Sequence, residues 1–249
     1  MRRIVLAVST LVAMVGLALV PVSSSATAHA CTNTNELWFR AGDGTTLVGH
    51  RFGGKKPGAR TTVVFAHMSV GDLCQWVPFA RNLAAKGYFA FPFDLRGHGF
   101  SKGSENHRRS PADVVAAVRA VRALGAKKII VVGASLGGIA AVMAAPKIQP
   151  PVTGVVAVSA PAAIAGELDA LSAAGRLRVP TLYVAAEDDQ NPPYDFAADA
   201  KTLFDATGTL EKRLEVVPGA LHGTFLVMGS KPVRSHLLEF LRNPAAAVP

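Results

Sequence analysis

The feature that most constrains the fold is a series of short, nearly continuous apolar runs separated by stretches of helical character. The runs cover residues 62–66, 88–93, 128–132, 152–159, 181–186 and 213–217. Their length and lack of apolar–polar alternation are typical of strands buried on both faces. The stretches read as helices cover residues 76–86, 111–124, 136–145, 164–174, 194–206 and 233–241. Strand alternating with helix predicts a mostly parallel sheet with helices on both faces.

Two further strands precede this series. Residues 36–40 and 46–52 lie on either side of Gly42-Asp43-Gly44, and an Asp-Gly pair favours a tight hairpin turn. The sequence therefore predicts an α/β fold with a central sheet of about eight strands. Because no linker-like segment interrupts the pattern, residues 31–249 are expected to form one domain. In such sheets ligands bind at the carboxyl ends of the strands, so functional residues are sought there.

The first thirty residues have the pattern of a secretory signal. Arg2 and Arg3 precede an apolar run over residues 4–20, and Ala28-His29-Ala30 follows as an A-x-A cleavage site. We expect residues 1–30 to be removed on export, leaving a secreted or cell-envelope protein with no membrane span. The alternatives are an uncleaved membrane anchor, for which the run is slightly short, and a lipoprotein attached through Cys31.

The chain has two cysteines, Cys31 and Cys74. Two thiols in an oxidising compartment usually pair, so we expect a disulfide between them; two free buried thiols and a lipidated Cys31 are the alternatives. Two cysteines exclude a disulfide-dense scaffold and a four-cysteine zinc site. The sequence contains no H-E-x-x-H, paired C-x-x-C or dinucleotide fingerprint, so neither a metal nor an organic cofactor is expected.

The chain is basic, with a net charge of +9 that falls to +7 when Arg2 and Arg3 leave with the signal. A basic balance raises the question of nucleic acid as a partner. The Lys and Arg residues are scattered, however, and the densest group, residues 107–109, is too short to form a binding stripe. We expect no nucleic-acid partner.

Residues 133–138 read Gly-Ala-Ser-Leu-Gly-Gly between the strand at 128–132 and a predicted helix. This is G-x-S-x-G in a strand–turn–helix context, the pattern of a nucleophile elbow. The turn is so tight that the neighbours two residues away must be small, and the helix N-terminus favours developing negative charge. A phosphate-binding loop would need a different glycine spacing or a following Lys-Ser/Thr. Ser135 is therefore the predicted nucleophile.

A serine nucleophile needs a base and an orienting acid, which in an elbow fold follow in the order Ser, Asp/Glu, His. The strand at 181–186 ends in Glu187-Asp188-Asp189, and the last strand is followed by His222 in a loop of small residues. The only later histidine, His236, falls within a predicted helix. His222 is the predicted base, and the acidic run holds the predicted acid.

Four segments together resemble the α/β-hydrolase superfamily over nearly the whole chain after residue 30. They are Phe65-Ala66-His67-Met68, the Asp94–Ser101 segment that matches D-x-R-G-x-G-x-S, the Ser135 elbow, and the loops holding Asp189 and His222. The family pattern P-x-L-x-x-x-G-x-x-D-x-x-x-P aligns with residues 180–193, with Ala186 in place of the glycine, and favours Asp189 over Asp188 as the acid. The resemblance implies that His67 and His98 are structural.

The resemblance also implies an oxyanion hole made by two backbone amides, those of Ser69 and Leu136. Met68 stands where relatives usually have glycine, and a glycine there adopts dihedrals that methionine resists. Only about twenty residues, 160–179, join two strands where many relatives insert a helical cap, so we expect an open site without a sizeable cap.

The resulting hypothesis is an exported serine hydrolase, a carboxylesterase of short or medium acyl esters with a small-molecule or lipid-like substrate. The same constellation supports hydrolysis of amides, thioesters, lactones or carbon–carbon bonds. A non-catalytic binding protein on the same fold is the alternative of a different class.

Overall fold

A computed structural model describes residue 31 and residues 35–246 of the chain. An eight-stranded sheet has the spatial order β1-β2-β4-β3-β5-β6-β9-β12. Strands β1 and β2 form an antiparallel hairpin, β2 pairs antiparallel with β4, and the remaining neighbours are parallel. The strands are β1 Glu36–Arg40, β2 Thr46–His50, β3 Thr62–Ala66, β4 Phe89–Phe93, β5 Ile129–Ala134, β6 Gly154–Val158, β9 Thr181–Ala186 and β12 Lys212–Val217. The predicted fold class is confirmed.

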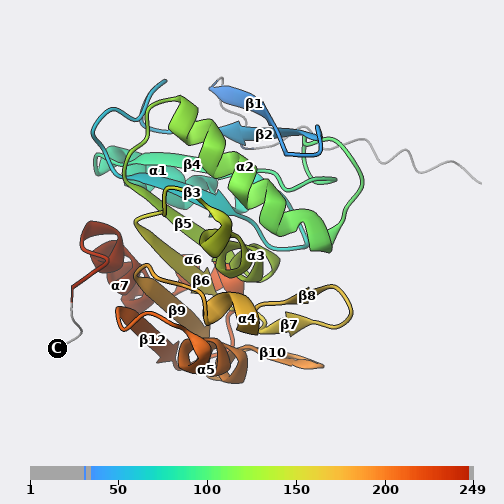
Figure 1. Cartoon of the computed structure of the whole chain (residues 1–249). Helices are drawn as coiled ribbons and strands as arrows, with labels where there is room; N and C mark the ends of the chain where they lie inside the picture. Colours follow the sequence, from blue (N-terminus) through green and yellow to red (C-terminus); the bar gives the residue numbers. More distant parts are fainter. Residues whose placement is uncertain (1–30, 32–34, 247–249) are drawn as a thin grey trace, which may run out of the picture.

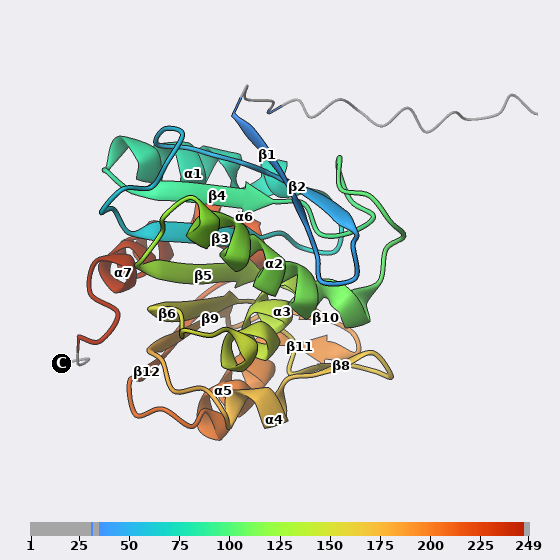
Figure 2. The same ribbon diagram turned by 45° about the horizontal axis from the view of Figure 1, so that its top comes forward.

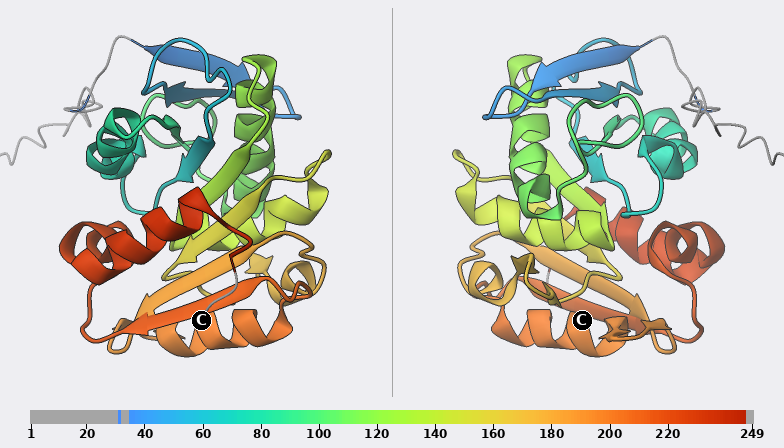
Figure 3. Two further views of the ribbon diagram at one scale, coloured as in Figure 1. Left: turned by 90° about the vertical axis from the view of Figure 1, so that its left-hand side faces the viewer. Right: turned by 90° about the vertical axis from the view of Figure 1, so that its right-hand side faces the viewer.

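Helices cover both faces of the sheet, as Figure 3 shows edge-on, with α1 and α7 on one side and α2 and α3 on the other. Helix α5 joins α2 and α3 in one apolar cluster, whereas α6 joins α1 and α7 in a second. The helices are α1 Val77–Ala85, α2 Ser110–Ala123, α3 Leu136–Ala144, α4 Leu171–Ala174, α5 Phe196–Ala206, α6 Gly223–Gly229 and α7 Lys231–Arg242.

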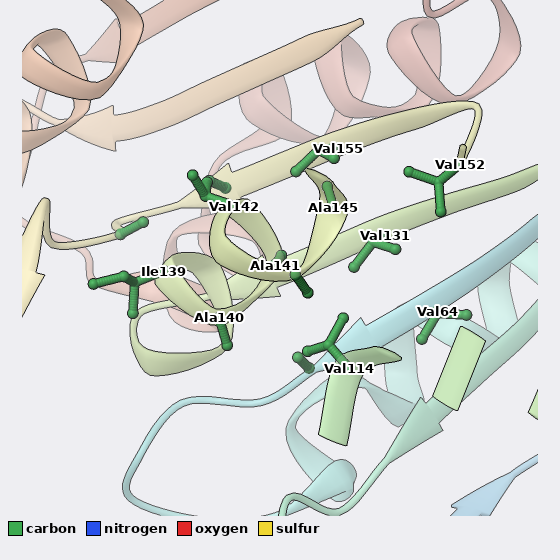
Figure 4. Close-up of a cluster of buried hydrophobic side chains, with 14 of the residues drawn as sticks. Val64, Val114, Val131, Ile139, Ala140, Ala141, Val142, Ala145, Val152 and Val155 are labelled. Atoms are coloured by element: carbon green, nitrogen blue, oxygen red, sulfur yellow. The ribbon is translucent and has the colours of Figure 1, made fainter. Parts of the chain in front are cut away.

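The continuous apolar runs arise because alternate residues of each strand point into different cores. In β3, Val64 packs in the cluster with α2 and α3, whereas Val63 and Phe65 pack in the cluster with α1 and α7. In β5, Val131 belongs to the first cluster and Val132 to the second. Figure 4 shows part of the first cluster, in which α3 lies against β5 and β6. A strand between two cores needs apolar residues at every position.

One predicted helix is wrong. Residues 164–174 do not form a continuous helix: β7 (Ala163–Ile164) and β8 (Leu168–Asp169) form a small antiparallel hairpin, and only the single turn of α4 follows. The reason is Gly166, which has φ +70° and turns the chain where a helix would need negative φ. A second small hairpin, β10 (Gln190–Asn191) with β11 (Tyr194–Asp195), delays the start of α5 to Phe196.

These two hairpins replace a cap. Both lie at the edge of the sheet toward which the parallel strands point (Figure 2), and no large inserted domain is present among the described residues. Figure 1 views the sheet from the side that α2 and α3 cover. The expectation of a fold without a sizeable cap is confirmed.

The export signal predicted at residues 1–30 lies outside the described residues. The predicted cleavage after Ala30 and the alternative of an uncleaved membrane anchor concern the same residues. Within residues 35–246 no helix combines the length and the apolar character needed to cross a bilayer.

The N-terminal end of the described chain is tied down by a disulfide between Cys31 and Cys74, with 5.6 Å between the two Cα atoms. Cys74 lies in η1 (Leu73–Trp76), a short 3-10 helix that leads into α1. The sulfur-bearing residues pack at the margin of the cluster that contains α1 and α7. The predicted pairing is therefore present, and the bond closes a loop that contains β1, β2 and β3.

We predict that Cys74→Ser lowers the free energy of unfolding by about 2–4 kcal/mol, because the cross-link restricts the unfolded chain across a separation of 43 residues. Urea unfolding without reductant measures the loss. Dithiothreitol should destabilise the wild type by a similar amount and leave Cys74→Ser unaffected; equal midpoints for the two proteins without reductant would contradict the prediction.

Candidate active site

Ser135 occupies the turn between β5 and α3 with φ +51°. A non-glycine residue in this region costs roughly 1–3 kcal/mol and persists only where the surrounding structure enforces it. Part of that enforcement is a hydrogen bond of 2.9 Å from the Ser135 N–H to the carbonyl of Val158 at the end of β6. The strained turn places Ser135 on the wall of a pocket at the carboxyl ends of the strands.

The glycines on either side of Ser135 let α3 approach the sheet closely. A Cβ at Gly133 would lie 2.0 Å from the carbonyl oxygen of Gly137, and a Cβ at Gly137 would lie 2.3 Å from the carbonyl oxygen of Ala66. No side chain fits at such distances, so the spacing of small residues around Ser135 is a steric requirement of this turn.

Asp189 and His222 meet although 33 residues separate them in the chain. The Nδ1 atom of His222 lies 2.9 Å and 3.0 Å from the two carboxylate oxygens of Asp189. The Asp189 residue is 3% exposed. Asp188 is exposed, and its N–H donates to the carbonyl of Gly219. The structure thus places Asp189, and not Asp188, against the histidine.

The pocket has a volume of about 400 Å³ and brings the predicted residues together. Ser135, His222, Ser69 and Leu136 all line it. Leu136 is the first residue of α3, where the backbone N–H has no partner within the helix. The ring of Phe196 lies 4.4 Å from that of His222 between centroids and forms part of the same wall. Sequence reasoning missed Phe196, because an aromatic residue at the start of a helix reads as ordinary core.

The pocket is apolar and open. None of the lining residues that the structure describes is Lys, Arg, Asp or Glu. At its mouth Val70 is 83% exposed and Phe225 is 62% exposed. Within residues 35–246 no cluster of three or more His, Cys, Asp or Glu has a geometry able to hold a metal ion. A volume of about 400 Å³ lies near the lower end of the range for small-molecule sites, roughly 300–1,000 Å³.

The loop after β3 carries Ser69 and is held by Gln75. The Met68 N–H donates to Gln75 Oε1 at 3.0 Å, and Gln75 Nε2 donates to the carbonyl of Val70 at 2.5 Å. One side chain therefore fixes the backbone on both sides of Ser69. Sequence reasoning did not find Gln75, because a glutamine in a loop carries no pattern that separates it from a solvated residue.

Met68 fits this loop without a glycine's dihedrals. Among the described non-glycine residues only Ser135 and Ser159 have positive φ, so the Met68 backbone is in an ordinary region. Its side chain is buried and passes over Gly223, where a Cβ would lie 2.4 Å from the Met68 sulfur. The methionine is accommodated because the glycine next to His222 leaves room for it.

His67 is buried and fastens the base of the same loop. Its Nε2 accepts a hydrogen bond of 3.0 Å from the Leu95 N–H. The proton of the neutral ring is therefore on Nδ1, which donates to the carbonyl of Met68 at 2.6 Å. Burial lowers the pKa of His67 to about 4, so the ring is neutral at pH 7. This bonding supports the structural role that the family resemblance implies for His67.

The Asp94–Ser101 segment also acts structurally. Asp94 accepts hydrogen bonds from the N–H groups of Leu73 and Phe100, at 2.8 Å and 3.0 Å, and so ties the loop after β4 to η1. Arg96 pairs with Asp113 on α2 and with Asp43 in the first hairpin turn. The bonds from Arg96 lower the pKa of the Asp43 carboxyl below its usual range, whereas burial raises that of Asp113.

The sequence of this chain is similar to those of known proteins over part of its length. Residues 61–170 match the sequence model of the alpha/beta hydrolase fold family. The uncharacterized protein YfhR of Escherichia coli strain K12 is 30% identical over 106 residues, which are 40% of this chain and 37% of the length of YfhR. The chain thus matches well under half of that relative.

Solved structures resemble the chain over most of its length. The esterase Pf2001 of Pyrococcus furiosus has a TM-score of 0.70 at 18% identity, covering 84% of this chain and 91% of the esterase. The esterase RhEst1 of Rhodococcus gives 0.64 at 19% identity, with 84% and 99% covered. An enol-lactonase of Burkholderia xenovorans gives 0.65 at 15% identity, with 82% and 100% covered. These structures share the fold that the motifs indicated, and the family model matches residues 61–170 of the chain.

We predict that His67 makes the protein less stable in mild acid. Its unfolded-state pKa is 6.5 and its folded pKa is about 4, so the unfolded chain binds the extra proton first as the pH falls. The contribution of His67 to the free energy of unfolding is fully present above pH 6.5 and is lost progressively as the pH falls to 4. Between pH 7 and pH 5 the free energy of unfolding should fall by about 2 kcal/mol for this reason. Urea unfolding at both pH values should show this component in the wild type and not in His67→Asn, which does not titrate. The same pH dependence in both proteins would refute it.

Proposed function

We propose that this chain, an α/β-hydrolase by fold and by motif, is a serine hydrolase that cleaves carboxylic esters through an acyl-enzyme. The observation that carries the proposal is the hydrogen-bonded Asp189–His222 pair, whose His222 lines the same pocket as the strained Ser135. A serine at its ordinary pKa is a weak nucleophile, and a histidine oriented by a buried carboxylate is the group that activates it.

In the proposed mechanism Ser135 Oγ attacks the carbonyl carbon of the ester while His222 Nε2 takes the serine proton. Asp189 bonds His222 Nδ1, which fixes the ring orientation and the tautomer that leaves Nε2 free to accept. His222 then gives the proton to the departing alcohol. Water, activated by the same histidine, attacks the acyl-enzyme and releases the acid, which restores Ser135.

The proposed oxyanion hole consists of the N–H groups of Ser69 and Leu136. Leu136 follows the nucleophile at the N-terminus of α3, where the aligned peptide dipoles favour negative charge. Ser69 lies in the loop that Gln75 fastens at both ends. Donors fixed in place before the reaction stabilise the developing charge without reorganisation, and losing one typically costs ~10²–10³ in rate.

The pocket supports a neutral substrate with a short or medium acyl chain. Its walls are largely apolar and lack Lys, Arg, Asp and Glu among the described lining residues, so a charged substrate would find none of these four side chains there to pair with. The volume of about 400 Å³ suits a small ester. Since the structural relatives include an enol-lactonase as well as esterases, a lactone is the second candidate substrate.

Export from the cytoplasm is part of the proposal. The Cys31–Cys74 disulfide is the kind of bond that persists in oxidising compartments and is rare in the cytosol. It supports the secretory signal expected at residues 1–30 and a secreted or cell-envelope location.

We predict that Ser135→Ala abolishes hydrolysis of a p-nitrophenyl ester series from acetate to palmitate, and that Asp189→Asn lowers kcat by about 10⁴-fold. Asp188→Asn is the matched control: it changes the neighbouring carboxylate, which is exposed, whereas His222 bonds Asp189, so kcat should stay within about twofold. The pocket volume predicts that shorter esters are better substrates than palmitate.

A fluorophosphonate probe separates the outcomes. Labelling of the wild type but not of Ser135→Ala, without turnover of any ester, would mean that the scissile bond is of another kind. No labelling of folded wild-type protein would favour a non-catalytic binding protein and overturn the proposal.

We predict that Gln75→Leu lowers kcat by about 10–100-fold while KM changes little, because the Ser69 amide is then no longer held where the oxyanion forms. Gln75→Glu retains the acceptor for Met68 N–H and loses only the donor to Val70, so its kcat should lie between those of the wild type and Gln75→Leu. Equal kcat in all three proteins would show that Gln75 does not fix the loop.

A further inference from the structure

Ser159 is a buried serine in an unfavourable backbone conformation directly after β6. Its φ is +46°, and it is 0% exposed. Ser135 is the only other described non-glycine residue with positive φ. Such strain is typical of positions where the surrounding structure over-determines the backbone for a functional reason. The proposed mechanism gives Ser159 no role.

Hydrogen bonds of Ser159 and of the preceding residue, Val158, reach the three segments that carry the proposed catalytic triad. The Ser159 N–H donates to the carbonyl of Val184 at 2.7 Å, in β9, the strand that leads to Asp189. The Ser159 Oγ accepts a hydrogen bond of 2.9 Å from the N–H of Gly223, the residue after His222. The preceding carbonyl, that of Val158, accepts from Ser135 N–H at 2.9 Å.

The peptide that Ser159 holds is confined on its other sides as well. Gly223 has φ +55°, and a Cβ there would lie 2.4 Å from the Met68 sulfur and 3.5 Å from the Ala134 Cβ. It therefore lies between the oxyanion loop and the residue before the nucleophile. Packing limits how far this peptide moves, but a directional bond to its N–H also fixes how it is rotated, and hence how the His222 side chain leaves the backbone.

We propose that Ser159 is a positioning residue, whose hydroxyl fixes the His222 loop relative to Ser135 and Asp189. The positive φ of Ser159 makes this possible, because it turns the Ser159 side chain at the end of β6 toward the loop that contains His222 and Gly223. This inference rests on the proposed function, since it assigns Ser159 to the same site.

The test compares Ser159→Ala and Ser159→Gly with the wild type on the best p-nitrophenyl ester. Both variants remove the acceptor of Gly223 N–H, so kcat should fall about 10–100-fold with KM within about twofold, the effect of misplacing a catalytic group by a fraction of an ångström to 1 Å. Ser159→Gly should nevertheless unfold at higher urea concentration than Ser159→Ala, because glycine adopts positive φ without strain. Stability and activity then do not change together.

Thr207→Val is the matched control. It removes another buried hydroxyl, one that bonds the Tyr183 hydroxyl at 2.6 Å at the end of α5. It should lower stability and leave kcat unchanged. If Thr207→Val loses as much kcat as Ser159→Ala, the effect is one of general stability and the inference fails.

A readout without substrate keeps this inference separate from the proposed function. The downfield proton NMR resonance of the His222 Nδ1–H bonded to Asp189 should broaden or vanish in Ser159→Ala and Ser159→Gly and persist in Thr207→Val. An unchanged resonance in both Ser159 variants would overturn the inference even if the wild type proves to be an active esterase. Conversely, loss of the resonance in folded protein that no fluorophosphonate labels would support the positioning role and refute the hydrolase.

Discussion

The close approach of α3 to the sheet is the constraint on which the rest of the molecule depends. It requires that nothing larger than hydrogen stand at Gly133 and Gly137, whose added Cβ atoms would lie 2.0 Å and 2.3 Å from backbone oxygens. A helix held this near to β3 and β5 leaves no room for a relaxed connection, so the joining residue takes φ +51°. The strain at Ser135 follows from packing, and the chemistry proposed for that residue uses a position that the core has already fixed.

The loops around this turn are held mainly by hydrogen bonds between side chains and the backbone. Gln75 and His67 bind the loop after β3, and Asp94 ties the loop after β4 to η1. Loops of this kind lack the ladder of a sheet, and each backbone group that is withdrawn from water needs another partner. A loop built in this way presents its remaining N–H groups in fixed directions, which is the property required of an oxyanion site.

The sequence predicted the eight-stranded α/β sheet because every central strand must supply apolar residues to two cores. Each such strand therefore appears in the sequence as a nearly continuous run of apolar residues. Because Ser135, Asp189 and His222 each follow a strand end, the sequence also predicted that they lie near one another: Ser135 and His222 line one pocket, and Asp189 bonds His222. The sequence did not predict the hairpin at residues 163–169. The apolar and polar residues of this segment suit a helix, and only Gly166, with its positive φ, prevents one. Gln75 and Ser159 were missed for a different reason: their roles depend on which backbone atoms face them, and no periodicity records this.

The absence of a sizeable cap over the described site bears on which step would limit the rate of a catalytic cycle. In enzymes with a lid, closure excludes solvent and opening releases product, and either motion often limits kcat. Here Val70 and Phe225 stand exposed at the mouth, and each hairpin beside it has strands of only two residues. In the proposed mechanism, bulk water would reach the acyl-enzyme without a preceding conformational change. Turnover by the proposed mechanism would then be limited by bond making and breaking, and an accumulating acyl-enzyme would appear as a burst of the first product.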